Sequence, residues 1–235
     1  MSKHILLAGF EPFGEFKVNP SELLVRSFEG RLIAGRLIVS RVFPVETKPL
    51  EDRLRQVLHE EKPEVVIGAG LASGRTGLAL ERLGVNLMNF SKPDAVGVVR
   101  HNDPIQRGGP EARLVTIPLD AIKTAWDEQG VPGYVSNDAG TYICNQFLYT
   151  SLGLAPEINP PPVCGFVHLP CLPAQAIELG AEKTPSMSLE TMKKGLEVMI
   201  EIIVPWLEAK PIERVAARGP AQSVWIPRGL KEVER

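Results

Sequence analysis

Cys144 stands where its side chain could act as a nucleophile. A short β-prone run over residues 134–136 leads into a polar turn that contains glycine, and an apolar pattern at helical spacing begins at Ile143. Cys144 is therefore expected in the first turn of a helix. Unpaired N–H groups and the positive end of the helix dipole stabilise a thiolate there, and the thiolate is the nucleophilic form of cysteine. A free cysteine is more often a small buried hydrophobic residue, so other residues must decide.

Two further side chains could complete a thiol-based catalytic group. His168 ends a strand predicted within residues 163–170, and open α/β sheets build their sites at such strand ends. Glu81 lies in an apolar strand predicted for residues 77–87, although that segment alone favours a solvent-facing carboxylate or an ion pair with Arg82. Cysteine peptidases use these three residue types. The imidazole takes the thiol proton and later protonates the leaving amine, while the carboxylate orients the imidazole.

The elements that must position these residues alternate between strand and helix, which predicts an α/β fold. Besides the strands of Glu81 and His168, we expect strands at residues 3–8, 36–45, 64–70, 114–117 and 133–136. Helices are expected at residues 20–28, 47–60, 118–129 and 188–207, with an irregular excursion over residues 89–112. The run at 64–70 is apolar throughout, as in a central parallel strand covered on both faces. Its glycines and Gly74 are spaced one residue too widely for a dinucleotide-binding motif.

Composition narrows the class of protein. The chain has 235 residues, 44% hydrophobic and 23% charged, which suits one domain over residues 1–209 followed by a charged tail at 210–235. The net charge of -2 argues against a nucleic-acid partner. No apolar run approaches the ~20 residues that a membrane helix needs. Three cysteines do not form a disulfide framework, so we expect thiols in a cytoplasmic protein.

Four motifs, in order, resemble those of the pyroglutamyl peptidase I family (pyrrolidone carboxyl peptidases), a family of cysteine peptidases. They are Gly9-Phe10-Glu11-Pro12-Phe13-Gly14 with Asn19-Pro20-Ser21, Gly70-Leu71-Ala72-Ser73-Gly74-Arg75 with Glu81-Arg82, Ser136-Asn137-Asp138-Ala139-Gly140-Thr141-Tyr142-Ile143-Cys144-Asn145, and Gly165-Phe166-Val167-His168-Leu169-Pro170. The similarity covers roughly residues 3–207. One departure is Ser91, which stands where the family has an arginine.

The resemblance implies a fold, an activity and a set of site residues. The fold would be a single three-layer α/β/α domain with a mostly parallel, twisted central sheet, assembled as a homotetramer or homodimer and working without a cofactor or metal. The activity would be removal of N-terminal pyroglutamate from peptides and proteins through a thioacyl intermediate. The implied catalytic residues are Glu81, Cys144 and His168. The implied substrate-binding residues are Phe10, Phe13, Leu71, Tyr142 and Ile143.

Three alternatives remain open. Cys164, His168 and Cys171 could form a metal site completed by Cys144, although structural zinc sites use tighter ligand pairs. A catalytically weak paralogue would bind pyroglutamyl peptides without cleaving them, which Ser91 motivates. A nucleoside phosphorylase on a similar sheet would need a phosphate-binding loop that we do not find in the sequence. In the tail, the apolar cluster Val224-Trp225-Ile226-Pro227 is expected to pack on its own or a neighbouring subunit.

Overall fold

The computed structural model describes residues 3–180 and 182–209. The tail expected at residues 210–235, with its cluster at 224–227, lies outside these described residues. Seven strands form one sheet in the order β2-β3-β1-β4-β9-β5-β8, and β6 and β7 form a separate two-stranded sheet. The strands are β1 (His4–Phe10), β2 (Leu32–Ile33), β3 (Arg36–Phe43), β4 (Val65–Leu71), β5 (Leu78–Glu81), β6 (Leu83–Val85), β7 (Ala112–Leu114), β8 (Gly133–Ser136) and β9 (Val163–Leu169).

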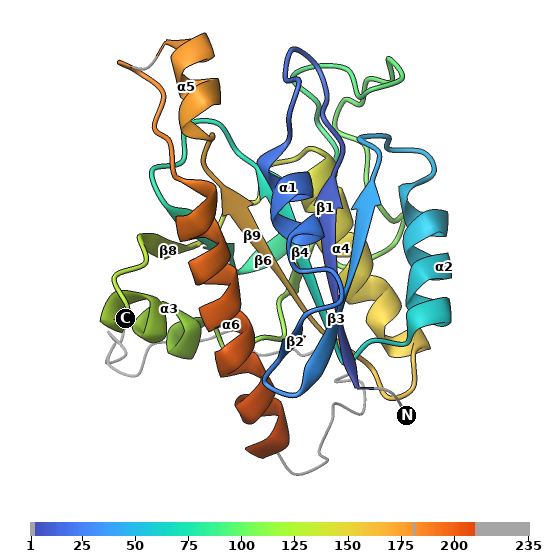
Figure 1. Cartoon of the computed structure of the whole chain (residues 1–235). Helices are drawn as coiled ribbons and strands as arrows, with labels where there is room; N and C mark the ends of the chain where they lie inside the picture. The colour runs from blue at the N-terminus through green and yellow to red at the C-terminus, as the bar shows by residue number, and fades with distance from the viewer. Residues whose placement is uncertain (1–2, 181, 210–235) are drawn as a thin grey trace, which may run out of the picture.

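Helices cover both faces of the large sheet (Figure 1). They are α1 (Pro20–Arg26), α2 (Leu50–Glu61), α3 (Leu119–Glu128), α4 (Ile143–Leu154), the 3-10 helix η1 (Ala155–Glu157), α5 (Pro173–Leu179) and α6 (Leu189–Ala209). Successive strand residues point to opposite faces. Accordingly Ile5 and Leu7 of β1 join one core with α1, α3 and α6, whereas Leu6 and Ala8 join a second core with α2 and α4. The result is the expected three-layer α/β/α domain with a mostly parallel sheet.

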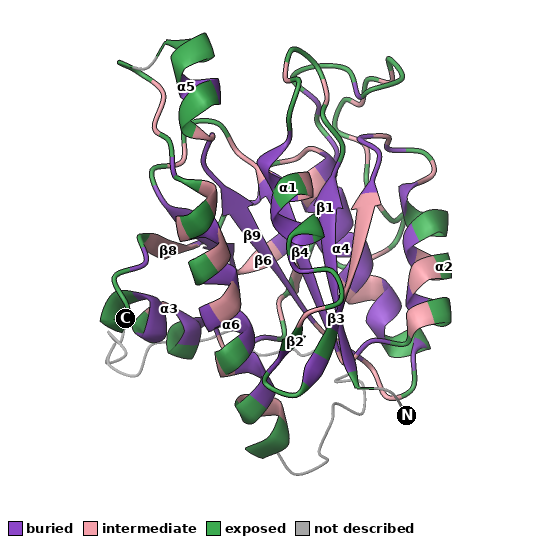
Figure 2. Ribbon diagram, in the orientation of Figure 1, coloured by how far each residue is buried: buried purple, intermediate pink, exposed green. Residues whose placement is uncertain are grey.

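The apolar run at residues 64–70 forms the central strand β4, as predicted. β4 pairs in parallel with β1 on one side and with β9 on the other. Helices cover both faces of the sheet at β4. Six of the seven residues of β4 are buried, as the purple central strands in Figure 2 show. A continuous apolar run therefore identified the central strand correctly.

A capping network fixes the loop after β1. The Asn19 side chain accepts a hydrogen bond from the Ser21 N–H at 3.0 Å, and Pro20 takes the first helical position of α1, as predicted. The amide of Asn19 also donates to the carbonyl of Glu11, and the Ser21 hydroxyl accepts from the N–H of Phe10. The start of α1 thus holds both ends of the loop that carries Phe13.

Two expected strands were wrong in extent. The segment predicted as one strand over residues 77–87 divides at Arg82 into β5 and β6, which belong to different sheets. The strand expected at 114–117 is β7, which ends at Leu114 and pairs antiparallel with β6. Alternation of apolar residues continues across the division, so periodicity alone could not show that the chain leaves the main sheet there. The helix α5 and the short strand β2 were not predicted.

Candidate active site

Three adjacent strands, β4, β9 and β5, bring Glu81 and His168 together. His168 of β9 lies opposite Gly70 of β4 in the parallel pair and opposite Ala79 of β5 in the antiparallel pair. Residues two apart on a strand share a face, so Glu81 lies on the same face as Ala79 and is a diagonal neighbour of His168. A glutamate side chain is long enough to span that diagonal, which is why strand pairing alone positions the contact.

Glu81 and His168 form a buried hydrogen bond. The Nδ1 atom of His168 lies 2.8 Å from Oε1 of Glu81, and the exposed fraction is 0% for Glu81 and 4% for His168. A carboxylate can only accept, so Nδ1 carries the proton and the other ring nitrogen is left for a different partner. The Phe166 ring packs edge-on against the imidazole with the ring centroids 5.0 Å apart. The imidazole is therefore fixed in both orientation and tautomer.

Cys144 is the second residue of α4, in the first turn as predicted. No side chain caps this helix at Tyr142, so the first-turn N–H groups and the helix dipole remain available to stabilise negative charge at the thiol. A Cβ atom on Gly70 would lie 2.6 Å from Sγ of Cys144. Only glycine at that position of β4 lets the helix bring the thiol so close to the sheet.

The thiol and the imidazole are coupled electrostatically. Burial by itself lowers the pKa of His168, but the charge and the hydrogen bond of Cys144, together with those of Glu81, outweigh it and raise this pKa to about 9. A histidine ring with a raised pKa holds its proton at neutral pH. The arrangement therefore supports a thiolate-imidazolium pair, which is the form that a cysteine nucleophile requires.

The five candidate substrate-binding residues differ in how far they are buried. Tyr142 and Phe13 are partly exposed, with their ring centroids 5.9 Å apart, and Leu71 is a half-buried residue at the end of β4. Phe10 and Ile143 are 2% and 1% exposed and belong to the core. The strand expected over residues 3–8 was too short, because β1 continues through Phe10.

The segment around Ser91 borders the same region. Ser91 itself is exposed. The ammonium group of Lys92 lies 4.5 Å above the centre of the Phe13 ring, a cation–π contact. The buried carboxylate of Asp94 anchors the segment by accepting hydrogen bonds from the backbone N–H groups of Thr47 and Val98.

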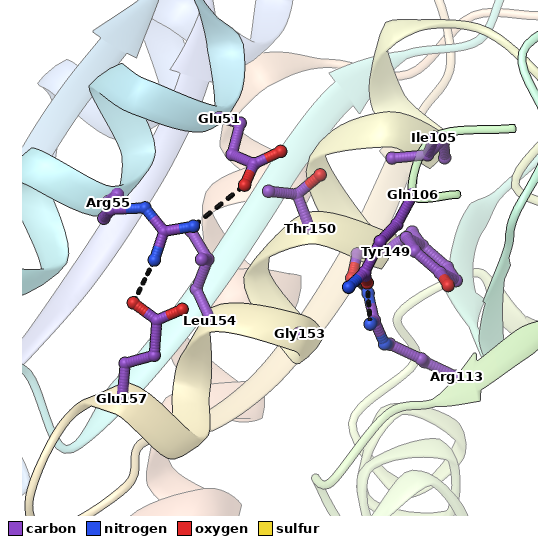
Figure 3. A pocket seen from close by; sticks show the side chains of 10 residues that line it. All are labelled: Glu51, Arg55, Ile105, Gln106, Arg113, Tyr149, Thr150, Gly153, Leu154 and Glu157. Atoms are coloured by element: carbon purple, nitrogen blue, oxygen red, sulfur yellow. Dashed lines mark hydrogen bonds and ion pairs between the residues drawn. The ribbon is translucent and has the colours of Figure 1, made fainter. Parts of the chain in front are cut away.

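Within residues 3–180 and 182–209, no three His, Cys, Asp or Glu side chains are grouped so that they could hold a metal ion. A cavity of about 70 Å³ lies elsewhere, between α2, α4 and the loop before β7. Figure 3 shows its wall, where Arg55 pairs with Glu51 and Glu157 and Arg113 bonds to Gln106. No cysteine or histidine lines it, so it has no nucleophile or general base of the kind found at Cys144 and His168.

Sequence reasoning missed two contributors to the site. The role of Gly70 was not found, although glycines at alternate positions of an apolar strand are a signal of close approach on one face. Arg75 was noted only as part of a motif, but its Nη2 lies 3.6 Å from Oε1 of Glu81. No local pattern marks that contact, because it joins the loop after β4 to β5 through the fold.

We expect the imidazole of His168 to titrate near pH 9. Because this pKa is raised, the ring keeps its proton between about pH 6.5 and 9, and the stability that it contributes is lost as the pH rises through about 9. Titration of the four histidine rings by NMR measures this, with His4, His59 and His101 as internal comparisons.

Cys144→Ser provides the control for this titration, because it removes the largest of the interactions that raise the pKa of His168, and it should lower that pKa. A ring at position 168 that titrates near 6.5 in the unsubstituted protein would contradict the coupling.

Proteins of one peptidase family are similar to this chain over most of its length. The family model described as "Pyroglutamyl peptidase" matches residues 3–205. A pyrrolidone-carboxylate peptidase of Pyrococcus furiosus is 36% identical over 203 residues, which cover 84% of this chain and 98% of the relative. One from Coprothermobacter proteolyticus is 39% identical over 206 residues, or 87% and 98%. Crystal structures of the Pyrococcus furiosus pyrrolidone carboxyl peptidase superpose with a TM-score of 0.84 at 35% identity, covering 87% of this chain and 99% of theirs. The chain belongs to the pyroglutamyl peptidase family.

Proposed function

We propose that this protein is a cysteine exopeptidase that removes N-terminal pyroglutamate (5-oxoproline) from peptides and proteins. The observation that carries the proposal is the buried Glu81–His168 hydrogen bond with the Cys144 thiol as the second partner of the imidazole. Membership of the pyroglutamyl peptidase family supplies the substrate class.

In the proposed reaction, the Cys144 thiolate attacks the carbonyl carbon between pyroglutamate and the next residue. The helix-start N–H of Cys144 stabilises the resulting oxyanion. The His168 imidazolium gives its proton to the leaving amine, the C–N bond breaks, and a thioester remains on Cys144. His168 then takes a proton from water, which attacks the thioester and releases pyroglutamate. Glu81 accepts from Nδ1 throughout and stabilises the charged ring.

In this proposal the substrate ring would bind beside the thiol. Phe13 and Tyr142 would enclose the pyrrolidone ring, Leu71 would offer its backbone and side chain to the lactam, and Phe10 and Ile143 would support this wall from behind. A neutral lactam can enter such an apolar slot, whereas a charged N-terminal amine would lose its hydration there. Selectivity for the cyclised terminus would follow from that difference.

We also propose an assembly and a compartment. The peptidase domain would span residues 1–209, and the tail at 210–235 would pack on its own or a neighbouring subunit of a homotetramer or homodimer. Large hydrophobic side chains exposed on the described surface support an assembly, among them Ile177 on α5 and Leu114 on β7, which are 72% and 65% exposed. The three free thiols suit the reducing cytoplasm. No helix in the described ranges is long and apolar enough to cross a membrane.

Light scattering of the full chain and of a chain ending at residue 209 tests the assembly. The full chain should have the mass of a dimer or tetramer, and removal of the tail should lower either that mass or the melting temperature. A monomeric full chain, or a shortened chain with unchanged mass and melting temperature, would contradict the respective part of this proposal.

The catalytic proposal is tested by hydrolysis of a pyroglutamyl chromogenic amide. Cys144→Ala and His168→Ala should each lose nearly all turnover, because the members of such a group act as a unit. Glu81→Gln should lose less, because the amide can still orient the ring. The matched prolyl amide, which carries a free amine in place of the lactam, should be cleaved far more slowly by the unsubstituted protein.

Cys164→Ala is the control variant, because this thiol is fully buried and burial raises its pKa to about 12. It should retain activity. Full turnover by Cys144→Ala, or equal cleavage of the prolyl and pyroglutamyl amides, would refute the proposed function.

Gly70→Ala should disable the site while leaving the fold in place. The added methyl group would stand 2.6 Å from Sγ of Cys144 and 3.0 Å from the Phe166 ring, so the thiol must move. A displacement of about 1 Å can cost on the order of 100-fold in rate. We expect kcat on the pyroglutamyl amide to fall by at least tenfold, with the far-ultraviolet circular dichroism unchanged.

Gly74→Ala separates this effect from a general loss of stability, because an added Cβ there meets nothing within 4 Å but the residue has a φ of +108°. Its cost should therefore appear in stability rather than in kcat. A Gly70→Ala protein with full kcat would show that the thiol does not depend on this close approach.

A further inference from the structure

We infer that Arg75 is a positioning residue of this site, one that balances its second negative charge and holds the turn that leads to the nucleophile. The inference rests on the proposed function, since it concerns how the thiolate form is maintained. Arg75 lies in the loop between β4 and β5, and its side chain is 27% exposed. It contacts Glu81 of β5 and, about 60 residues further along the chain, Tyr134 and Asp138.

Arg75 balances the charge of the site. In its nucleophilic form the site holds two anions, the Glu81 carboxylate and the Cys144 thiolate, against one cation, the His168 imidazolium. Among the described residues, only His168 and Arg75 form ion pairs with Glu81, at 2.8 Å and 3.6 Å. The guanidinium therefore supplies a second positive charge beside the buried Glu81 carboxylate, which shares the imidazolium with the partly buried Cys144 thiolate.

One oxygen of the Glu81 carboxylate lacks a hydrogen bond. Oε2 of Glu81 is buried and has no hydrogen-bond partner among the described residues, so this carboxylate depends on its neighbours for stabilisation more than a fully bonded one would. Tyr142 does not add a compensating or competing charge. Burial, together with the charges of Asp94 and Cys144, raises the pKa of Tyr142 to about 12 and keeps the phenol neutral.

The guanidinium of Arg75 also binds the segment that leads to Cys144. Nη2 of Arg75 donates to the backbone carbonyl of Asp138 at 2.7 Å, and Nη1 donates to the Tyr134 hydroxyl at 3.1 Å. Asp138 lies in the turn that precedes Cys144, where its carboxylate accepts from the N–H of Gly140 at 2.8 Å. A planar guanidinium with several fixed donors can hold such a fork, whereas a single ammonium group cannot reproduce it. Arg75 thus links the triad carboxylate to the approach to the nucleophile.

Arg82 offers a matched comparison. It follows Glu81 directly and contacts the same turn, with its Nε 2.9 Å from Oδ1 of Asn137. Among the ion pairs of the described residues, none joins Arg82 to Glu81. Loss of Arg82 therefore removes a cation and a turn contact without removing the charge beside the carboxylate.

The test follows the rate at which iodoacetamide alkylates Cys144 as a function of pH, located by peptide mass mapping. Arg75→Met should move the acid limb of this profile to higher pH by about one unit, because one cation must then stabilise two anions. Arg75→Lys keeps the charge and should leave the limb within a few tenths of a unit of the unsubstituted protein. Arg82→Met should leave the limb unchanged.

Hydrolysis of the pyroglutamyl amide gives an independent readout. Because Arg75 contacts Glu81 and the turn before Cys144, a positioning role predicts that Arg75→Met lowers kcat with KM altered less than about twofold. If Arg75→Met does not fold, Arg75→Gln takes its place, since it lacks the charge but can still donate to Asp138.

An acid limb in the uncharged Arg75 variant that coincides with that of Arg82→Met would overturn the inference. Alkylation needs no peptide substrate. An unsubstituted protein that is alkylated normally but cleaves no pyroglutamyl amide would therefore refute the proposed function while leaving the role of Arg75 decided by the acid limb.

Discussion

The hydrogen bond between His168 and Glu81 is the interaction on which the candidate site depends. Both side chains are almost wholly excluded from water, and a buried carboxylate without a charged partner would cost several kcal/mol. The partner is provided by strand pairing, since β5 runs antiparallel to β9 and places Glu81 diagonally across from His168. This antiparallel pair lies between strands whose other neighbours in the sheet, β4 and β8, pair in parallel, and it therefore has a chemical consequence.

Glycines in β4 allow the helix that carries Cys144 to pack closely on the sheet, and hydrogen bonds of its polar side chains hold it there. Gly68 and Gly70 leave room on one face of β4 for the Phe166 ring and the thiol. Immediately after the nucleophile, the buried amide of Asn145 bonds to the backbone N–H and carbonyl of Val85. Gln146 bonds to both the hydroxyl and the carbonyl of Thr47. These contacts fix the first turn of α4 relative to β6, which follows Glu81 after a single residue.

Local patterns in the sequence predicted most of the helices and strands and singled out the side chains of Glu81, Cys144 and His168. The apolar run of β4, the Asn19 cap with Pro20, and the helix start before Cys144 are each decided by neighbouring residues, so they could be found without the fold. The partnership of Glu81 with His168 joins residues 87 positions apart, and only the family resemblance suggested it. The contacts of Arg75 were not suggested even by the resemblance, because its partners come from β5, β8 and the turn at 136–140.

The burial of Phe10 and the division of the segment at Arg82 could not be predicted, for a related reason. The alternation of apolar and polar residues is the same whether a strand continues or gives way to a loop. Where the strand ends depends on the side chains that pack against its last residues. Phe10 packs on Phe147 and Phe166, with ring centroids 5.7 Å and 6.5 Å away. Those partners come from α4 and β9, more than a hundred residues along the chain.

The central claim is that Cys144 forms a covalent bond to the pyroglutamyl group. Acid quenching within milliseconds of mixing the protein with an activated pyroglutamyl ester, followed by intact-mass and peptide mass spectrometry, tests it most directly. The account predicts a pyroglutamyl thioester on the peptide that contains Cys144, formed and lost at rates consistent with turnover, and absent from Cys144→Ala. Turnover of the ester with no adduct, or an adduct on Cys164 or Cys171 instead, would contradict the account.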